Sequence, residues 1–265
     1  MQCIFMQGFA MSLERIWPVR DNLQDYLQDF PEHLQRYDLI ADYIEGLDCA
    51  DISCGVGYGA YLMGKLAKSV KGFDIAEEAL VHAGKNFTSN NVSFHHLNEL
   101  EDQKFQFISS IETLEHMSEV EGDKFLQKIH HALLPNGTLL ISTPLNETQY
   151  KEHTTEFHIR EYSFQEFKNK LETNGFSIEN IYGISNTVSI RLASTKLGFS
   201  LMGILNTGLH RIIPTSIRKT IAKILLKKDS EGVADSCTLT QDSLHGAFCQ
   251  IAICSIKHTT LSDQA

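Results

Sequence analysis

Residues 50–59 constrain the fold of this 265-residue chain more than any other stretch. They run Ala-Asp-Ile-Ser-Cys-Gly-Val-Gly-Tyr-Gly, with an acid at the end of a predicted buried strand and three alternate glycines before a predicted helix. Glycine lets a backbone turn sharply and approach a ligand, because it has no Cβ and tolerates positive φ. A strand, a glycine loop and a helix start in this order predict a parallel α/β sheet that binds a small polar or charged ligand at its carboxyl edge.

The glycines alone leave two ligand classes open. Gly55-x-Gly57-x-x-Ala60 also satisfies the loose dinucleotide pattern, which predicts NAD or FAD. Asp51 favours the other class, because a carboxylate here repels a pyrophosphate and attracts an ammonium or a sulfonium. Asp74 ends the next strand-like run and can accept hydrogen bonds from both hydroxyls of a ribose, which both classes contain. A turn that binds nothing is the simplest alternative, but three glycines cost backbone entropy without structural return.

Strand and helix patterns alternate along most of the chain. Short β-rich runs alternate with stretches whose apolar residues recur at helical spacing. Two predicted helices start with a capping box, Ser118-x-x-Glu121 and Ser163-x-x-Glu166. The order predicts a doubly wound, mostly parallel seven-stranded sheet, whose last two strands form an edge pair with one strand antiparallel. The expected strands are 48–53, 70–74, 92–94, 105–108, 138–142, 176–182 and 247–256.

We expect four segments along the chain: an N-terminal extension and helical cap (1–45), a ligand-binding core (46–185), a helical insertion with a loop (186–244), and the last core strand with a tail (245–265). Within the insertion, 211–228 combines isoleucines at helical spacing with six basic side chains. This pattern favours an amphipathic helix packed on the core with a solvated basic face, and peripheral membrane contact is the alternative. The polar stretch 229–243 predicts a flexible loop.

Composition excludes several classes of protein. A formal net charge of −10 argues against a nucleic-acid partner. Six cysteines without a Cys-x-x-Cys pair indicate a reducing cytoplasm. The sequence contains no apolar run long enough to cross a bilayer. Residues 1–11 lack the basic start of a signal peptide, so we expect a disordered extension, with Met11 as an alternative start, on a soluble cytoplasmic protein.

Four motifs in register resemble the class I S-adenosylmethionine-dependent methyltransferases. They are Asp51-x-x-x-Gly55-x-Gly57-x-Gly59, then Asp74, then Ile111-Glu-Thr-Leu-Glu-His116, then Leu133-Leu-Pro-Asn-Gly-Thr-Leu-Leu-Ile-Ser-Thr-Pro144. The resemblance covers residues 47–182 and implies S-adenosylmethionine as the cofactor. It also implies cofactor contacts for a set of residues at the strand ends and on the N-terminal cap: Asp51, Ser53, Gly55, Gly57, Asp74, Ile75, Leu97, Asn98, Arg36 and Tyr37. In this set Arg36 would pair with the carboxylate of the cofactor's amino-acid end.

Further motifs resemble one branch of that family, the bacterial methyltransferases encoded among O-antigen and other surface-polysaccharide genes. They are Glu14-Arg15-x-x-Pro18, His33-Leu-x-Arg36-Tyr37, Gly57-Tyr-Gly59 and Glu156-Phe-His-Ile-Arg-Glu-Tyr162. This resemblance implies a glycan or other small-molecule acceptor. Two positions depart from it: Val56 stands where the branch usually has an acid, and Asn98 where an acid often follows the third strand. Asn98 would therefore meet the adenine amino group through its side-chain carbonyl.

Methyl transfer to a hydroxyl needs alignment and a group that takes the proton. Glu112 and His116 follow the fourth strand directly, where strand order reverses, and lie four residues apart. We expect His116 to be the general base, since its unperturbed pKa lies near neutrality, and Glu112 to orient it or the substrate. A histidine that only fixes the helix start is the structural alternative. We expect Glu115 to face solvent.

The segment after the fifth strand supplies candidates for the acceptor pocket. His158 and Arg160 are the residues we expect to line it. His158 together with Glu152, His153 and Glu156 raises the question of a metal. The spacing matches no zinc signature and methyl transfer needs none, so we expect no metal.

Three other functions compete with sugar O-methylation. An O-methyltransferase for a phenolic quinone precursor is the nearest, because ubiquinone-biosynthesis methyltransferases share a Glu-x-Leu-Glu-His run. An NAD-dependent oxidoreductase would need a hydride-transfer constellation at its substrate site, which the motifs above do not supply. A non-catalytic methyltransferase-like scaffold is disfavoured by the intact Asp51, glycines and Asp74. The sequence leaves the acceptor, the methylated atom and the oligomeric state open.

Overall fold

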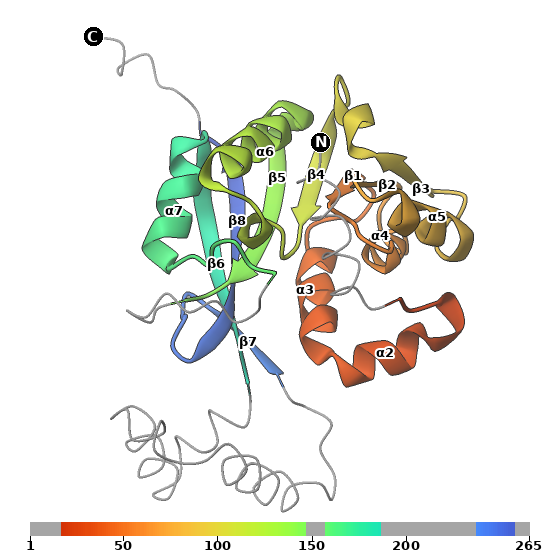
Figure 1. Cartoon of the computed structure of the whole chain (residues 1–265), viewed down its shortest axis with the longest axis horizontal. Coiled ribbons are helices and arrows are strands. Elements are labelled where there is room, and N and C mark those ends of the chain that lie inside the picture. Colours follow the sequence, from red (N-terminus) through yellow and green to blue (C-terminus); the bar gives the residue numbers. More distant parts are fainter. Residues whose placement is uncertain (1–16, 147–156, 187–236, 258–265) are drawn as a thin grey trace, which may run out of the picture.

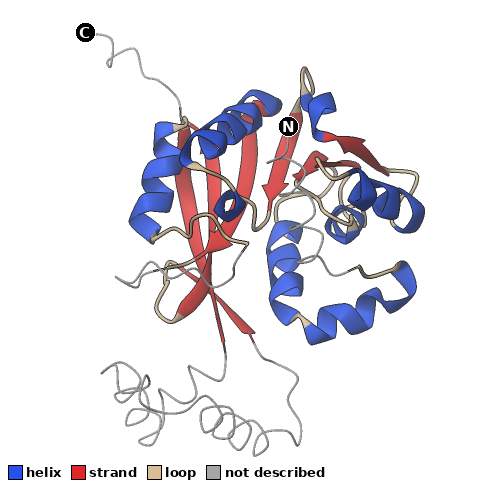
Figure 2. Ribbon diagram, in the orientation of Figure 1, coloured by secondary structure: helices blue, strands red, loops and turns tan. Residues whose placement is uncertain are grey.

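The computed structural model describes residues 17–146, 157–186 and 237–257. They form one eight-stranded sheet with helices on both faces, in the strand order β3-β2-β1-β4-β5-β8-β6-β7 (Figure 1, Figure 2). The strands are β1 (Asp48–Ile52), β2 (Ser69–Asp74), β3 (Val92–His96), β4 (Phe105–Ser110), β5 (Leu133–Pro144), β6 (Phe176–Asn186), β7 (Cys237–Gln241) and β8 (Ala247–Ile256). In sheet order, the first five strands (β3, β2, β1, β4 and β5) are parallel to one another.

The rest of the sheet consists of β8, β6 and β7, of which β8 and β7 run antiparallel to the first five strands. β8 lies between β5 and β6 and runs antiparallel to both. β7 pairs antiparallel with β6 at the edge. The expectation of seven strands was therefore wrong by one strand, and β7 lies in the stretch 229–243 that we predicted to be a loop. Its residues Thr238, Leu239 and Thr240 are only partly buried, because an edge strand needs little more than a backbone partner.

Helices cover the sheet from two sides. They are α2 (Leu23–Asp29), α3 (Pro31–Ala41), α4 (Tyr58–Met63), α5 (Glu77–Asn86), α6 (Glu119–Ala132) and α7 (Phe164–Thr173), with short 3₁₀ helices η1 (Arg20–Asn22), η2 (Leu97–Leu100) and η3 (Leu114–His116). Both predicted capping boxes are present: Ser118 caps α6 and Ser163 caps α7, each with the returning glutamate. Capping satisfies amide groups that the first helical turn leaves without partners, so it fixes where α6 and α7 begin.

The core has one cluster on each face because successive strand residues point to opposite sides. Ile52, Ile108 and Ile141 pack against Leu126 of α6 and Phe167 of α7. On the other face, Cys49, Phe107 and Leu140 pack against Ile40 of α3 and Met63 of α4. Figure 1 shows α6 and α7 together over β5, β8 and β6, with α3 at the lower end of the strands. All these clusters leave the carboxyl ends of β1, β2 and β4 for polar side chains.

Several expectations concern residues outside the described part of the chain. They are the extension 1–11, the basic stretch 211–228 with its alternative of membrane contact, and the acids and histidine at 152, 153 and 156. Within the described ranges, none of the helices combines the length and the apolar character needed to cross a membrane.

Two glycines shape the turn between β1 and α4. Gly55 has φ +53° and Gly57 has φ +90°, which is the left-handed region that side chains disfavour. They differ in their surroundings. A Cβ on Gly57 would lie 2.5 Å from Cβ of Ala83 and 2.7 Å from the ring of Phe94, whereas a Cβ on Gly55 would meet no atom within 4 Å. Gly57 therefore closes the packing of α4 on α5 and β3, and Gly55 leaves the loop backbone open to a ligand.

Gly57→Ala should lower the free energy of unfolding by at least about 2 kcal/mol, because it adds left-handed strain to an overpacked contact. The matched control is Gly84→Ala on the exposed side of α5, where a Cβ meets nothing within 4 Å. That substitution should stabilise the protein by roughly 0.5–1 kcal/mol. Urea unfolding of both variants checks the pair, and equal stabilities would contradict the packing around Gly57.

Candidate active site

The parallel register collects acids at one edge of the sheet. Asp51 on β1 lies opposite Gly72 of β2 and Ser109 of β4. Asp74 is the last residue of β2, and Glu112 follows β4 by two residues. Because the carboxyl ends of parallel strands meet at the same edge, these side chains surround the glycine turn. This edge is the candidate site.

Asp51 is the most informative member. Its side chain is buried, one oxygen accepts a hydrogen bond of 2.9 Å from Ser109 Oγ, and the other oxygen has no hydrogen-bond partner among the described residues. Burial raises the pKa of Asp51 to about 7; the charge of Asp74 adds to the rise, and the Ser109 hydrogen bond opposes it. A buried, unpartnered carboxylate oxygen is costly. This geometry is compatible with a cationic ligand beside Asp51, which stays a prediction.

Asp74 holds the glycine turn in place. Its two oxygens accept hydrogen bonds from the backbone amides of Gly55 (2.8 Å) and Ala76 (2.9 Å). Between Asp51 and the turn, Ser53 has φ +64°, so its backbone is in the left-handed region as well. Ile75 directly after Asp74 is exposed. Each carboxylate oxygen can accept a second hydrogen bond, so a ribose contact at Asp74 stays a prediction that this geometry permits.

The η2 turn after β3 carries the two residues expected near an adenine. Leu97 is partly buried and packs against the core. Asn98 exposes its side chain, and its backbone amide donates to Nδ1 of His96. An adenine contact by the Asn98 side chain stays a prediction.

Helix α3 brings Arg36 and Tyr37 onto the site. Arg36 is buried, and its Nη2 lies 3.4 Å from Oε2 of Glu112. Its Nε has no partner among the described residues, so one donor remains for a ligand. The hydroxyl of Tyr37 lies against the backbone of Gly59, where a Cβ would overlap it. Burial raises the pKa of Tyr37 well above its usual range, and the charge of Asp51 adds to the rise.

Glu112 is fixed from several directions. Its own backbone has φ +48°. Ser142 Oγ donates to Oε1 over 2.7 Å, and Cys249 Sγ approaches the same oxygen at 3.4 Å. With Arg36 on the other oxygen, both carboxylate oxygens are engaged. Sequence patterns could not identify Ser142 or Cys249 as partners, since β5 and β8 meet Glu112 only in the folded sheet.

The expectation that Glu115 faces solvent was wrong. Its side chain is fully buried, and Oε2 accepts a hydrogen bond of 3.0 Å from Thr143 Oγ1. Its backbone carbonyl accepts from the amides of Ile159 (2.7 Å) and Arg160 (3.0 Å), so the segment after residue 156 covers it. Burial raises the pKa of Glu115 well above its usual range, and the charge of Glu112 adds to the rise.

The same segment brings His158 to His116. The two rings lie edge to face with centroids 5.1 Å apart. Nδ1 of His116 is 3.2 Å from the carbonyl oxygen of Phe157, and Nδ1 of His158 is 2.6 Å from Oε1 of Glu161. A carbonyl only accepts, so Nδ1 of His116 carries the proton and Nε2 carries the lone pair. Glu161, which lies inside the Glu156–Tyr162 motif but was assigned no role from sequence, is buried.

Arg160 does not join this group through its guanidinium. It forms ion pairs with Glu119 of α6 and with Glu166 of α7, the latter at 3.2 Å, and lies 5.0 Å over the ring of Tyr162. Its expected contact with an acceptor stays a prediction, and these contacts compete with it.

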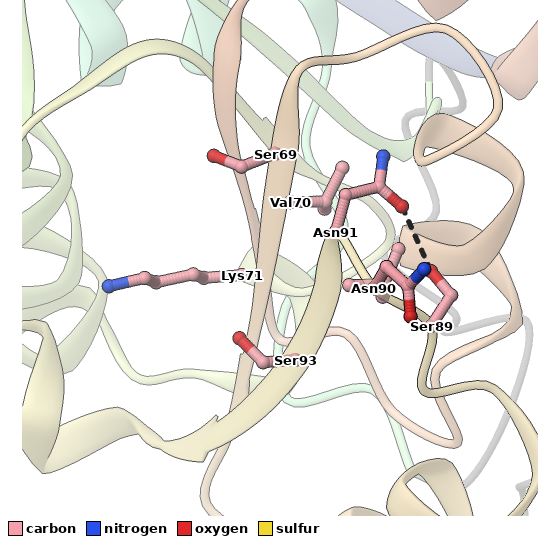
Figure 3. A pocket seen from close by; sticks show the side chains of 8 residues that line it. Ser69, Val70, Lys71, Ser89, Asn90, Asn91 and Ser93 are labelled. Carbon is pink, nitrogen blue, oxygen red and sulfur yellow. Dashed lines mark hydrogen bonds between the residues drawn. The ribbon is translucent and has the colours of Figure 1, made fainter.

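A small hollow elsewhere on the sheet is a separate feature. Figure 3 shows it between the starts of β2 and β3, lined by small polar and apolar side chains such as Ser69, Asn91 and Ser93. Ser89 Oγ donates to Asn91 Oδ1 across 2.9 Å at its rim. It opens at the amino ends of parallel strands, opposite the edge that carries Asp51 and Asp74, and is lined by no acid.

The comparisons with known proteins identify the family. A family model described as a methyltransferase domain matches residues 19–181. The chain belongs to the S-adenosylmethionine-dependent methyltransferases. S-adenosylmethionine is therefore the cofactor, and NAD is not supported. The match spans the cap helices, the glycine turn and the sheet as far as β6, which is the part of the chain that builds the candidate site.

Two curated relatives and one solved structure show how far the likeness extends. A probable S-adenosylmethionine-dependent methyltransferase of Mycolicibacterium smegmatis is 28% identical over 178 residues, covering 65% of this chain and 68% of the relative. A ubiquinone biosynthesis O-methyltransferase of Chelativorans sp. is 31% identical over 140 residues, so the chain spans about half of that relative (51%). The YcgJ protein of Bacillus subtilis has a TM-score of 0.53 at 16% identity, covering 86% of this chain and 100% of that one, which supports the fold alone.

Cofactor binding should release a proton from Asp51. At pH 6 a carboxyl with a pKa of about 7 is mostly protonated in the free protein. A cationic ligand end beside it favours the ionised form, so the proton leaves and affinity for S-adenosylhomocysteine rises between about pH 5.5 and pH 8. Calorimetry at pH 6 in buffers of different ionisation enthalpy measures the release. Asp51→Asn should abolish both effects, and proton uptake by the parent would place the cationic end elsewhere.

Proposed function

We propose that the protein transfers the methyl group of S-adenosylmethionine to a hydroxyl of a sugar, polysaccharide or glycolipid. The observation that carries the proposal is the pairing of two kinds of polar group at one sheet edge. Asp51 and Asp74 lie on β1 and β2, where they suit the cofactor, and Glu112 and His116 follow β4, where they suit a hydroxyl. Methyl transfer requires the acceptor oxygen to lie in line with the methyl carbon and the sulfur of the cofactor, so both ligands must bind at this edge.

The residues present suit the cofactor. The unpartnered oxygen of Asp51 would pair with the ammonium of its amino-acid end, and Nε of Arg36 would donate to the neighbouring carboxylate. Asp74 would accept from the ribose hydroxyls, with the open backbone at Gly55 beside it. The cofactor supplies a methyl group on a sulfonium, which is already activated. The protein has chiefly to align the acceptor oxygen and exclude water.

His116 and Glu112 are the groups we assign to the acceptor. The proton on Nδ1 of His116 leaves the lone pair on Nε2, the nitrogen that acts on a hydroxyl. Glu112 is held by Arg36 and Ser142, so it positions the acceptor without reorganising. His158 lies beside His116 and adds a third polar side chain on the acceptor side.

Polar residues around these groups favour a hydroxyl-rich acceptor. Ser142 and Thr143 lie at the end of β5, and Asn146 lies just beyond it, where its Nδ2 donates to Oε2 of Glu161 over 3.2 Å. The motifs shared with the surface-polysaccharide branch support the same class. A phenolic acceptor is the second candidate, because curated relatives at 26–31% identity are named ubiquinone biosynthesis O-methyltransferases.

An acceptor assay decides between these classes. The full chain is incubated with methyl-labelled S-adenosylmethionine and two matched panels, oligosaccharides with sugar nucleotides in one and dihydroxybenzoate-type phenols in the other. We expect label in the first panel, on oxygen, as identified by mass spectrometry of the product. Transfer confined to the phenols would replace the saccharide by a quinone precursor, and transfer to nitrogen or carbon would overturn O-methylation itself.

His116→Ala should lower kcat by roughly 100-fold, with affinity for S-adenosylhomocysteine within a factor of a few, because His116 acts on the acceptor and lies outside the cofactor contacts. His131→Ala, on the exposed side of α6, is the matched control and should leave both unchanged. The melting temperature of each variant is measured alongside. An unchanged kcat in a stable His116→Ala protein would remove the histidine from the chemistry.

A further inference from the structure

We propose that Glu115, His116 and His158 bind a divalent cation of the zinc class next to the acceptor. Each residue offers one ligand atom, and the three atoms lie within 4.8 Å of one another. Oε1 of Glu115 is 4.0 Å from Nε2 of His116. Ligands of tetrahedral zinc lie about 2.0–2.2 Å from the ion and therefore about 3.3–3.6 Å from one another. Side-chain shifts below about 1 Å therefore close the site.

The outer partners of both histidines match those of metal ligands. Metal-binding histidines nearly always donate their second ring N–H to a carboxylate or a carbonyl, which fixes the tautomer and aims the lone pair. Here Nδ1 of His116 faces the carbonyl of Phe157, and Nδ1 of His158 faces the carboxylate of Glu161. Glu161 is itself held by Nδ2 of Asn146, 3.2 Å from Oε2. Both imidazoles are thus arranged to present Nε2.

Glu115 gives the independent observation. Its carboxylate is fully buried, yet only Oε2 is bonded, to Thr143, and Oε1 has no hydrogen-bond partner among the described residues. An orphaned buried oxygen carries a full desolvation cost. The orphan lies on the side of the carboxylate that faces Nε2 of His116. A cation between them satisfies this oxygen, which no described protein group does.

The ligand set selects the kind of ion. Two imidazoles and a carboxylate suit zinc, cobalt, iron or manganese, whereas magnesium and calcium prefer oxygen ligands alone. Glu112 is not needed, since Arg36 and Ser142 occupy its oxygens. Three protein ligands leave positions for an exogenous oxygen. This deepens the proposed function and rests on it for its role: with the ion bound, His116 is a ligand rather than the free base, and the acceptor hydroxyl, its pKa lowered by the ion, gives its proton to water.

Sequence spacing predicted no metal, because His116 and His158 belong to different segments. The structure joins them through the backbone amides of Ile159 and Arg160, which donate to the carbonyl of Glu115. The ligand set is therefore assembled by tertiary contacts rather than by a local motif.

Cobalt titration of the tag-free full chain tests the site without any acceptor. After treatment with a chelator, the chain should take up one Co²⁺ per molecule, seen as visible d–d absorption, and Zn²⁺ should displace it. His158→Gln and Glu115→Gln should weaken Co²⁺ binding by at least about 100-fold, and Glu161→Gln by about 10–100-fold. His131→Ala, an exposed histidine outside the cluster, should bind like the parent.

Each outcome has one meaning. Absence of stoichiometric Co²⁺ binding in the parent overturns the site, and so does parent-like binding in both His158→Gln and Glu115→Gln. Glu161→Gln keeps all three ligands, so it stays informative if a ligand variant fails to fold. S-adenosylhomocysteine binding is measured on the same samples. Its loss with cobalt binding intact would defeat the proposed function alone, and the reverse would defeat the metal site alone.

Discussion

The ion pair between buried Arg36 and partly exposed Glu112 joins the N-terminal cap to the sheet edge that carries the site. Burial by itself lowers the pKa of a guanidinium, but Glu112 and Cys249 more than offset this, so the net shift keeps Arg36 charged. Removing Glu112 would leave the buried charge of Arg36 uncompensated, at a cost below the value of about 3–5 kcal/mol that is typical of a fully buried pair. Helix α3 is therefore held over the glycine turn, with Tyr37 against Gly59. The Arg36–Glu112 ion pair therefore fixes the position of the cap relative to the glycine turn and to the residues that follow β4.

Local rules predicted the parts of the fold that local sequence determines. The glycine turn, Asp51 and Asp74 at strand ends, and the capping boxes at Ser118 and Ser163 all follow from residue type and spacing, and the structure contains each one. The number of strands was harder. β7 has little apolar alternation, because an edge strand is half solvated and gains its pairing from β6. Its polar sequence therefore predicted a loop.

Distant contacts determine the parts of the site that sequence missed. Glu115 is charged in type, so exposure was the natural expectation. Its burial arises because the segment around Ile159 folds back onto its carbonyl, and Gln250 of β8 anchors that segment through the carbonyl of Tyr162 at 2.9 Å. The meeting of His116 with His158 has the same origin. No spacing rule reports a contact that three separate segments create together.

The charges that change during methyl transfer explain why acids on the cofactor side and on the acceptor side would have different roles. Methyl transfer turns a sulfonium into a neutral thioether, so a carboxylate beside the sulfur would stabilise the starting state more than the transition state. The ammonium of the cofactor keeps its charge throughout, and Asp51 therefore gives affinity without slowing transfer when it pairs there. The acceptor oxygen behaves in the opposite way, because it must lose a proton. The cation that we propose on Glu115, His116 and His158 would stabilise that loss. In the proposed mechanism Asp51 and Glu115 would thus serve one reaction by holding cations of different kinds.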